Sequence, residues 1–263
     1  MKTSTLAAVL LLIVAGPASA FEDMLAQPGT VHGSVGLAVG VKPEYAGAKD
    51  SETRLMPHVS LYYGQTLFLT GMTAGANLFR QHTTQGIAIT AGPLLALRGG
   101  RQEDDNAALN GLGDIDRGLD AGAFVRLRKG QWQLRADVRA DVSAGDGGTT
   151  VNISAGHGWH VDEKLHARAI LDATWASSDH MNTFFGIDAV QAAYAGLSQY
   201  QADAGFKGAG VNLMVDRAIN SEWTGFAALR YTRLIGDAAD SPIVADLGSR
   251  NQVAANAGIK YRF

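Results

Sequence analysis

The sequence predicts an all-β protein: a transmembrane, antiparallel, up-and-down β-barrel of about 12 strands, with short periplasmic turns and longer outer loops. Three observations predict it. Apolar and polar residues alternate over segments of about 11 residues, the four tryptophans lie near the ends of such segments, and 32 of the 263 residues are glycine. A barrel with lipid outside and a polar interior shows this alternation, because successive side chains of a strand point to opposite faces.

The composition excludes several other classes of protein. The chain has no cysteine, which excludes disulfide scaffolds, thiolate metal sites and cysteine nucleophiles. Its formal net charge of -3 provides no polybasic surface, so we expect no nucleic-acid partner. A soluble β-sandwich or lipocalin-like barrel would also alternate, but its strands are commonly only about 5–6 residues long.

The first twenty residues predict a cleaved signal peptide. Lys2 supplies the positive charge, residues 6–15 form an apolar core, and Ala18-Ser19-Ala20 resembles a cleavage site. The apolar run is shorter than the ~20 residues of a spanning helix. We therefore expect export through a signal peptide at 1–20, and one outer-membrane barrel domain at 21–263.

The predicted strands are bounded by turn residues and follow one another without a linker. They lie at 32–41, 53–63, 66–70, 73–79, 85–97, 117–128, 131–143, 149–160, 164–175, 201–215, 222–235 and 252–263. The division at Gly71-Met72 is chosen because it places all the long connections on one side of the membrane, as outer-membrane barrels do. Those connections lie near 42–52, 98–116, 176–200 and 236–251.

The apolar face of these strands carries the aromatic residues. In 131–142, for example, Trp132, Leu134 and Val138 share one face, whereas Arg135 and Asp137 share the other. Aromatic side chains gather at the two membrane interfaces of such barrels. The predicted aromatic girdle consists of Trp132, Trp159, Trp175, Trp223, Tyr261 and Phe263.

The polar face predicts a charged lumen. Its candidate charge network consists of Asp120, Arg126, Arg128, Arg135, Asp137, Arg139, Asp141, Arg168, Asp172 and Arg230. A two-residue turn at Lys129-Gly130 would place Asp120 opposite Arg139. The network would close the lumen with ion pairs, select solutes at a constriction, or only hydrate the interior. The mixture of signs favours closure.

One outer loop predicts a plug. The stretch GDAADSPIV at 236–244 combines acidic residues with a proline and an apolar end. We expect this loop either to fold into the barrel mouth or to remain solvated, with its carboxylates near lipopolysaccharide cations. The candidate plug residues are Asp237, Asp240, Ser241 and Pro242.

Chemistry that would make the chain an enzyme is not evident from its motifs. The sequence has neither HExxH nor GxSxG, and it predicts no catalytic residue, metal site or cofactor. His160 and His166 flank a turn and would approach each other, but two ligands without a third are a poor metal site. Ser154 and His157 would lie on opposite strand faces.

Several segments resemble the MipA/OmpV family of outer-membrane proteins (MltA-interacting protein), and the resemblance spans nearly all of 21–263. They are PEYAGAKDSETRLMPHVSLYYG (43–64), GLGDIDRGLDAGAF (111–124), NTFFGIDAVQAAYAGLSQYQADAGFK (182–207), GDAADSPIV (236–244) and NAGIKYRF (256–263). The resemblance implies an outer-membrane barrel. It also implies a scaffold that joins a lytic transglycosylase to a peptidoglycan synthase, since one member is regarded in that way.

The sequence therefore predicts a non-enzymatic outer-membrane scaffold or structural protein linked to peptidoglycan synthesis and turnover, in contact with lipid and lipopolysaccharide. A narrow solute channel or a surface adhesin is the alternative. An outer-membrane lipid hydrolase is the third hypothesis.

Overall fold

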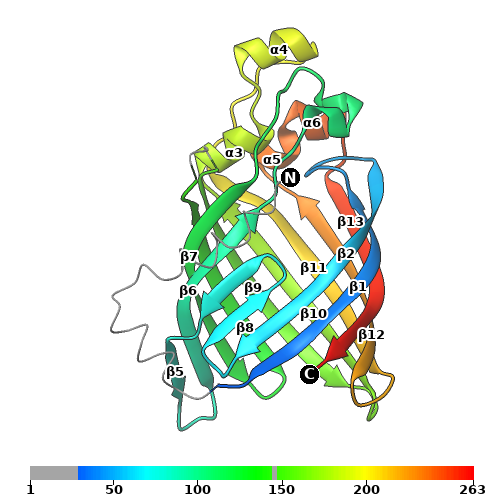
Figure 1. Cartoon of the computed structure of the whole chain (residues 1–263). Coiled ribbons are helices and arrows are strands. Elements are labelled where there is room, and N and C mark those ends of the chain that lie inside the picture. Colours follow the sequence, from blue (N-terminus) through cyan, green and yellow to red (C-terminus); the bar gives the residue numbers. More distant parts are fainter. Residues whose placement is uncertain (1–28, 144–146) are drawn as a thin grey trace, which may run out of the picture.

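The computed structural model describes residues 29–143 and 147–263, and these form one antiparallel β-barrel (Figure 1). The predicted signal peptide at 1–20 lies outside the described residues. The strands are β1 (Val31–Pro43), β2 (Ser51–Tyr63), β3 (Leu67–Thr70), β4 (Thr73–Ala76), β5 (Phe79–His82), β6 (Ala88–Arg98), β7 (Gly118–Lys129), β8 (Trp132–Asp141), β9 (Thr149–His160), β10 (Leu165–Ala176), β11 (Gly205–Ala218), β12 (Trp223–Leu234) and β13 (Asn251–Arg262).

The barrel closes with twelve strands, and β5 is one strand more. Neighbouring strands pair from β4 through β1, β13 and on to β6, and the pairing of β4 with β6 completes the circle. The short β5 continues along β6 below β4, and its register is displaced by one residue, with Gly75 opposite Leu94 but Phe79 opposite Ala91. The predicted all-β barrel is confirmed, and its strand 73–79 is interrupted by an irregularity.

The two ends of the barrel differ. At one end, which we call the turn end, short connections such as 130–131, 161–164 and 219–222 join the strands. At the other, the loop end, the connections 99–117, 177–204 and 235–250 are long and carry the helices (Figure 1). Short turns face the periplasm in outer-membrane barrels.

The β7–β8 hairpin corrects the predicted register. The turn is Gly130-Gln131, since Lys129 pairs with Trp132, and Gly130 adopts a φ of +57°. A glycine at the first central position is what such two-residue hairpins favour, because that position needs a positive φ. Asp120 therefore lies opposite Asp141 and not Arg139, which pairs with Gly122.

The wall is lower at one place. β3 and β4 are four residues each, so β2 extends from Ser51 to Val59 beyond the part that pairs with β3. The N–H of Gly71 donates to the Val59 carbonyl. The backbone N–H and C=O groups of the odd-numbered residues of β2 therefore point toward the side of β3. Pro57 has the same parity, so the residue without an N–H lies at the open edge, where proline is tolerated.

The loops of the loop end pack into a cap over the barrel mouth. Its elements are η1 (Glu103–Asp105), η2 (Ala107–Leu109), α3 (Ser178–Phe185), α4 (Ala189–Ala195), α5 (Asp237–Asp240) and α6 (Pro242–Ala245). The cap has its own apolar core, in which Met181, Phe185 and Val244 pack together beside a second group that includes Leu109 and Ile243. No helix in the described part of the chain is long and apolar enough to span a membrane.

Candidate functional site: the barrel lumen

The predicted charge network lies on the strand face opposite the exposed apolar side chains. Leu134 and Val138, for example, are 52% and 42% exposed, whereas Asp137 between them is 5% exposed. The register carries this inward parity from strand to strand, for Asp137 pairs with Asn152, which pairs with Thr174. All ten residues have inward parity, and the structure divides them into two groups along the barrel axis.

The first group forms ion pairs in the loop-end half. Arg98, at the end of β6, donates from Nε to Asp120 at 3.1 Å and from Nη2 to Asp141 at 2.7 Å. Asp141 also accepts the Ser143 and Gly147 N–H groups. These carboxylates lie side by side on β7 and β8, and one arginine bridges both. The predicted partner Arg139 does not contact Asp120.

Asp137 supports a second set of pairs, deeper in the barrel. Its two oxygens accept from Arg135 Nε at 2.9 Å and from Arg139 Nε at 3.0 Å, and its side chain is 4% exposed. Asp172 accepts from Arg230 Nη2 at 2.8 Å across β11. These five residues were among the predicted ones, although the pairing itself depends on registers that the sequence does not define.

Arg98 was missed, because it follows the last residue of the predicted strand 85–97, and three charged residues on β1 and β2 were missed as well. Glu52 forms ion pairs with Lys42, at 3.0 Å from Nζ, and with Arg54, at 2.6 Å from Nε, on β1 and β2. Arg54 has inward parity in the predicted strand 53–63, which was the available signal. Lys42 and Glu52 lie just outside the predicted strand ends, where periodicity no longer assigns a face.

The second group, in the turn-end half, lacks such pairs. Arg126, Arg128 and Arg168 have no carboxylate within 4.0 Å in the described parts of the chain, and Arg128 donates only to Gln133 at 3.3 Å. Lys260 and Arg262 of β13 join them, of which Lys260 pairs with Asp216. Most charged side chains of the lumen near the cap are therefore ion-paired, with Lys207 an exception, whereas those near the turns are mainly unpaired and basic.

The predicted plug residues lie in the cap. Ser241 is fully buried and donates from Oγ to the Phe185 carbonyl at 2.6 Å, and Pro242 begins α6 among buried residues. The Asp237 carbonyl accepts from Tyr200, and Asp240 pairs with Arg250 at the surface. The serine and proline thus contribute to the cap interior, while the aspartates lie at its rim.

His180 of α3 connects the cap to the lumen. Its Nδ1 hydrogen donates to the Gly147 carbonyl at 2.9 Å, so Nε2 accepts from Lys207 at 2.8 Å. Burial, the positive charge of Lys207 and that of Arg98 lower the pKa of His180 to about 3, against the Gly147 hydrogen bond, which acts in the other direction. The ring is therefore neutral at physiological pH and serves as an acceptor for the lysine.

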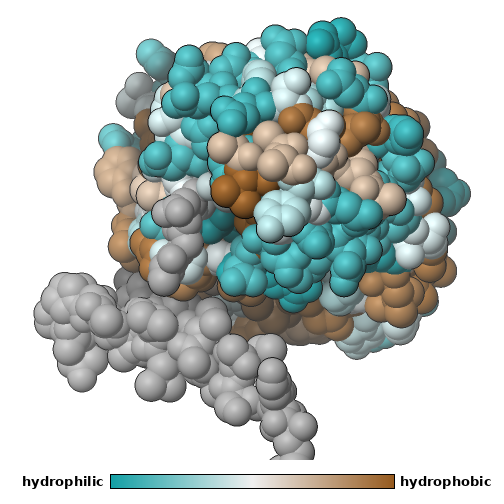
Figure 2. Space-filling view, turned by 90° about the horizontal axis from the view of Figure 1, so that it is seen from above, coloured by the Kyte–Doolittle hydropathy of each residue, from teal (hydrophilic) through white to brown (hydrophobic). Residues whose placement is uncertain are grey.

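Seen from above, the cap presents a continuous, mainly hydrophilic surface with hydrophobic side chains near its centre (Figure 2).

Five of the six predicted girdle residues gather at the turn end. Trp132 contacts His157, which contacts Trp159 in turn, and Tyr261 lies between Trp223 and Phe263. Trp175 lies at the other end of its strand, beside the cap. The turn end therefore has an aromatic belt of the kind that anchors barrels at a membrane interface.

The histidine and serine candidates lie on the strand faces that the alternation predicted. His160 and His166 meet edge to face at 4.5 Å, while His157 lies on the outer face beside the tryptophans and Ser154 on the inner. Within the described residues, no three His, Asp or Glu side chains are grouped to hold a metal ion.

A closed barrel with an apolar exterior, a charged lumen and an aromatic belt at its short turns defines an outer-membrane β-barrel protein. The family model described as "MltA-interacting protein MipA" matches residues 35–263, and the chain belongs to this family. No curated protein matches the sequence.

Two solved structures illustrate the matches, both at low identity. The NanC porin matches with a TM-score of 0.50 and 10% identity, over 87% of this chain and 100% of the porin. The Pseudomonas putida toluene transporter TodX matches with a TM-score of 0.38 and 11% identity, over 95% and 92% of the two chains. At such identities the likeness to the porin concerns the barrel fold alone.

Proposed function

We propose that this chain is a non-enzymatic anchor in the outer membrane that binds a murein-processing enzyme at its periplasmic turn end. The observation that carries the proposal is the difference between the two barrel ends. The loop end is covered by a cap with a buried core, whereas the described turn-end connections are short and are covered by no other described element. The description of the family supports the kind of partner, because it names an interaction with MltA.

The turn end offers a contact surface of mixed charge. Asp162, Glu163 and Lys164 occupy one turn, and Arg217 lies 3.8 Å from Asp162. Charged residues at the edge of an interface guide association and register more than they add affinity. We therefore expect a partner with complementary charge to approach from the periplasm.

The test is a binding measurement between the purified full-length protein in nanodiscs and an MltA-type lytic transglycosylase, with surface plasmon resonance as the readout. Exchanging Asp162, Glu163 and Lys164 for Ser-Gly-Ser is expected to weaken binding. The matched control, Tyr194→Ala on the exposed α4 helix of the cap, is expected to leave it unchanged. Absence of binding by the unaltered protein, or an equal loss in both variants, would contradict the proposal.

The cap also bears on the alternative of a narrow solute channel. A channel needs a continuous path, and the cap core lies over the mouth of this barrel. Planar-bilayer recording of the unaltered protein is expected to give no conductance steps. Regular steps that change in size in Arg139→Ala would support the channel in place of the anchor.

A further inference from the structure

The turn-end half of the lumen contains an excess of positive charge. Its charged side chains include residues within three positions of the turn-end terminus of β7, β8, β10, β11 and β13, and of these Arg135 of β8 pairs with Asp137. We call the basic residues Arg126, Arg128, Arg168, Lys260 and Arg262 the basic vestibule; Asp216 is the one carboxylate that pairs with any of them in the described residues. Like charges in a confined, low-dielectric space repel one another and attract anions strongly.

The arginines on β7 and β8 show this excess most directly. Arg126 lies directly opposite Arg135, a pairing of like charges that is unfavourable in a sheet. Both guanidinium groups lie over the ring of Phe124, at 5.4 Å and 4.7 Å from its centroid. Asp137 pairs with Arg135 but not with Arg126. Phe124 is itself fixed against Phe68 and Leu94, so it holds the Arg126 guanidinium in place without neutralising it.

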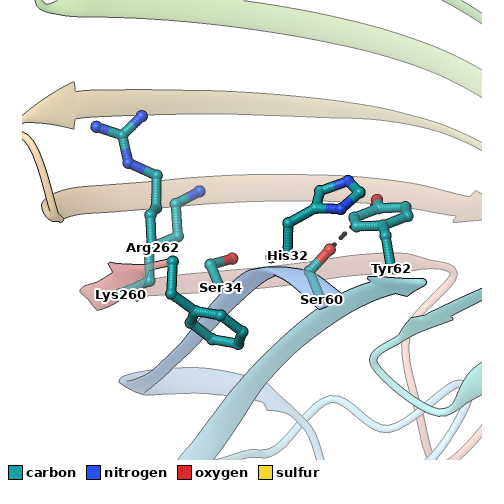
Figure 3. A pocket seen from close by; sticks show the side chains of 8 residues that line it. His32, Ser34, Ser60, Tyr62, Lys260 and Arg262 are labelled. Carbon is teal, nitrogen blue, oxygen red and sulfur yellow. Dashed lines mark hydrogen bonds between the residues drawn. The ribbon is translucent and has the colours of Figure 1, made fainter. Parts of the chain in front are cut away.

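The opposite side of the vestibule is hollow. A cavity of about 400 Å³ at the turn end is lined by side chains of β1, β2 and β13 (Figure 3). Lys260, Arg262, His32 and Tyr62 rise from the wall on the same side in this view, and His32 stacks on Tyr62 at 5.4 Å. Ser60 donates to the Tyr62 hydroxyl at 3.3 Å.

The cavity and the arginines of β7 belong to one region. Tyr62 on β2 lies opposite Phe68 on β3, Phe68 meets the ring of Phe124 edge to face, and the Arg126 guanidinium lies over that same ring. The lumen here therefore presents guanidinium groups on one side, and a lysine, a further guanidinium and hydroxyl groups on the other. Guanidinium groups bind carboxylate and phosphate groups in a bidentate manner, and such pairs are stronger than neutral hydrogen bonds.

We propose that the basic vestibule is a binding site for a small solute with two or more carboxylate or phosphate groups, which enters from the turn end. The basic side chains on β7 and β13 would each bind one anionic group, and the hydroxyls of Ser60 and Tyr62 would bind polar groups between them. The solute enters from the periplasm because the cap covers the other end. This proposal does not depend on the murein-enzyme partner.

The test is isothermal titration calorimetry on the full-length protein in a neutral detergent at low ionic strength. The probes are citrate, which carries carboxylates, pyrophosphate, which carries phosphates, and maltose, which is neutral. We expect citrate or pyrophosphate to bind and maltose not to bind, and we expect the affinity to fall as salt screens the charges. Whichever anion binds more tightly identifies the preferred group.

Two variants locate the site. Arg126→Gln is expected to weaken anion binding about tenfold, as expected for a lost charge-assisted hydrogen bond. Arg233→Gln removes an arginine at the loop end of β12, which contacts Asn251 on the outer face, and is expected to leave binding unchanged. Retained heat-modifiable migration in gels confirms that each variant has folded, and Arg262→Gln replaces Arg126→Gln if the latter has not. No binding of either anion, equal binding of maltose, or equal loss in Arg233→Gln would overturn the proposal.

Discussion

In the loop-end half of the lumen, Arg98, Arg139 and Arg230 each have a carboxylate oxygen within 3.1 Å, whereas in the turn-end half Arg126 and Arg168 have none among the described residues. The same wall, with the same alternation of side chains, thus produces two different interiors. Ion pairs predominate at the covered end, beneath the cap, where Lys207 donates instead to the neutral His180 ring. Unpaired charge accompanies the uncovered end, where solvent or a ligand reaches it.

The difference shows that the net charge of a lumen is a poor guide to its function. The strand register is also needed, because it decides which charged side chains form ion pairs. A buried charge needs a partner, because removing an isolated ion from water has a cost in free energy that only an ion pair and hydrogen bonds can offset. Unpaired arginines are tolerated where water or an anion can contact them. The four predictions that follow test this contrast, from the largest expected effect to the smallest.

The first prediction concerns the cap itself. Phe185 is 1% exposed and packs in the cap core, so Phe185→Ala is expected to lower the local stability of the cap by about 3–5 kcal/mol. Hydrogen exchange followed by mass spectrometry measures this as faster exchange in α3 and 235–250, with the turn-end strands unchanged. Tyr194→Ala, on a side chain that is 80% exposed, is the control. Equal exchange in both variants would show that the cap does not depend on its core.

The second prediction concerns the ion pairs. Asp137→Asn removes the charge that Arg135 and Arg139 share, and these side chains are 17% and 30% exposed. We expect the free energy of unfolding to fall by about 2 kcal/mol, as for hydrogen bonds to charged groups. Urea unfolding in detergent, followed by tryptophan fluorescence, measures it. Asp162→Asn, in an exposed turn, is expected to have no measurable effect; a similar loss there would contradict the contrast.

How far the sequence could anticipate this contrast depends on the kind of information needed. Period-two alternation assigned faces, so the barrel and the inward parity of residues such as Asp137 could be derived from local pattern. Register is different, because it depends on where each turn begins, and the choice of Lys129-Gly130 over Gly130-Gln131 moved every partner on β8 by two residues. The helices of the cap escaped prediction because their apolar residues are few and are buried by contacts between distant loops, as with Ser241 and Phe185.

The third prediction concerns pH and the attachment of the cap. The pKa of His180 in the folded protein is about 3, below its ordinary value of 6.5, so the unfolded cap binds a proton that the folded cap does not. The contribution of this residue to stability is complete above pH 6.5 and decreases as the pH falls toward 3, by at most about 1.4 kcal/mol per pH unit.

Hydrogen exchange of α3 at pH 7 and pH 5, corrected for the intrinsic exchange rate, measures this change. His180→Gln removes the titrating ring and is expected to reduce the difference between the two pH values. An identical pH dependence in both proteins would assign it to another group.

The smallest effect compares two arginines that differ in pairing. Arg230→Gln leaves Asp172, whose side chain is 7% exposed, without its cation, and is expected to lower stability by about 1 kcal/mol, because the arginine is itself 44% exposed and water screens the pair. Arg168 lies four residues from Asp172 on β10 and has no carboxylate partner in the described chain, so Arg168→Gln removes repulsion and is expected to leave stability unchanged or slightly higher. Parallel urea titrations measure both.

Anion binding separates the variants in the opposite order, since only Arg168 belongs to the basic vestibule. Citrate affinity is expected to fall in Arg168→Gln and to persist in Arg230→Gln. A variant pair that changed stability and anion affinity together would mean that the two halves of the lumen are not distinct.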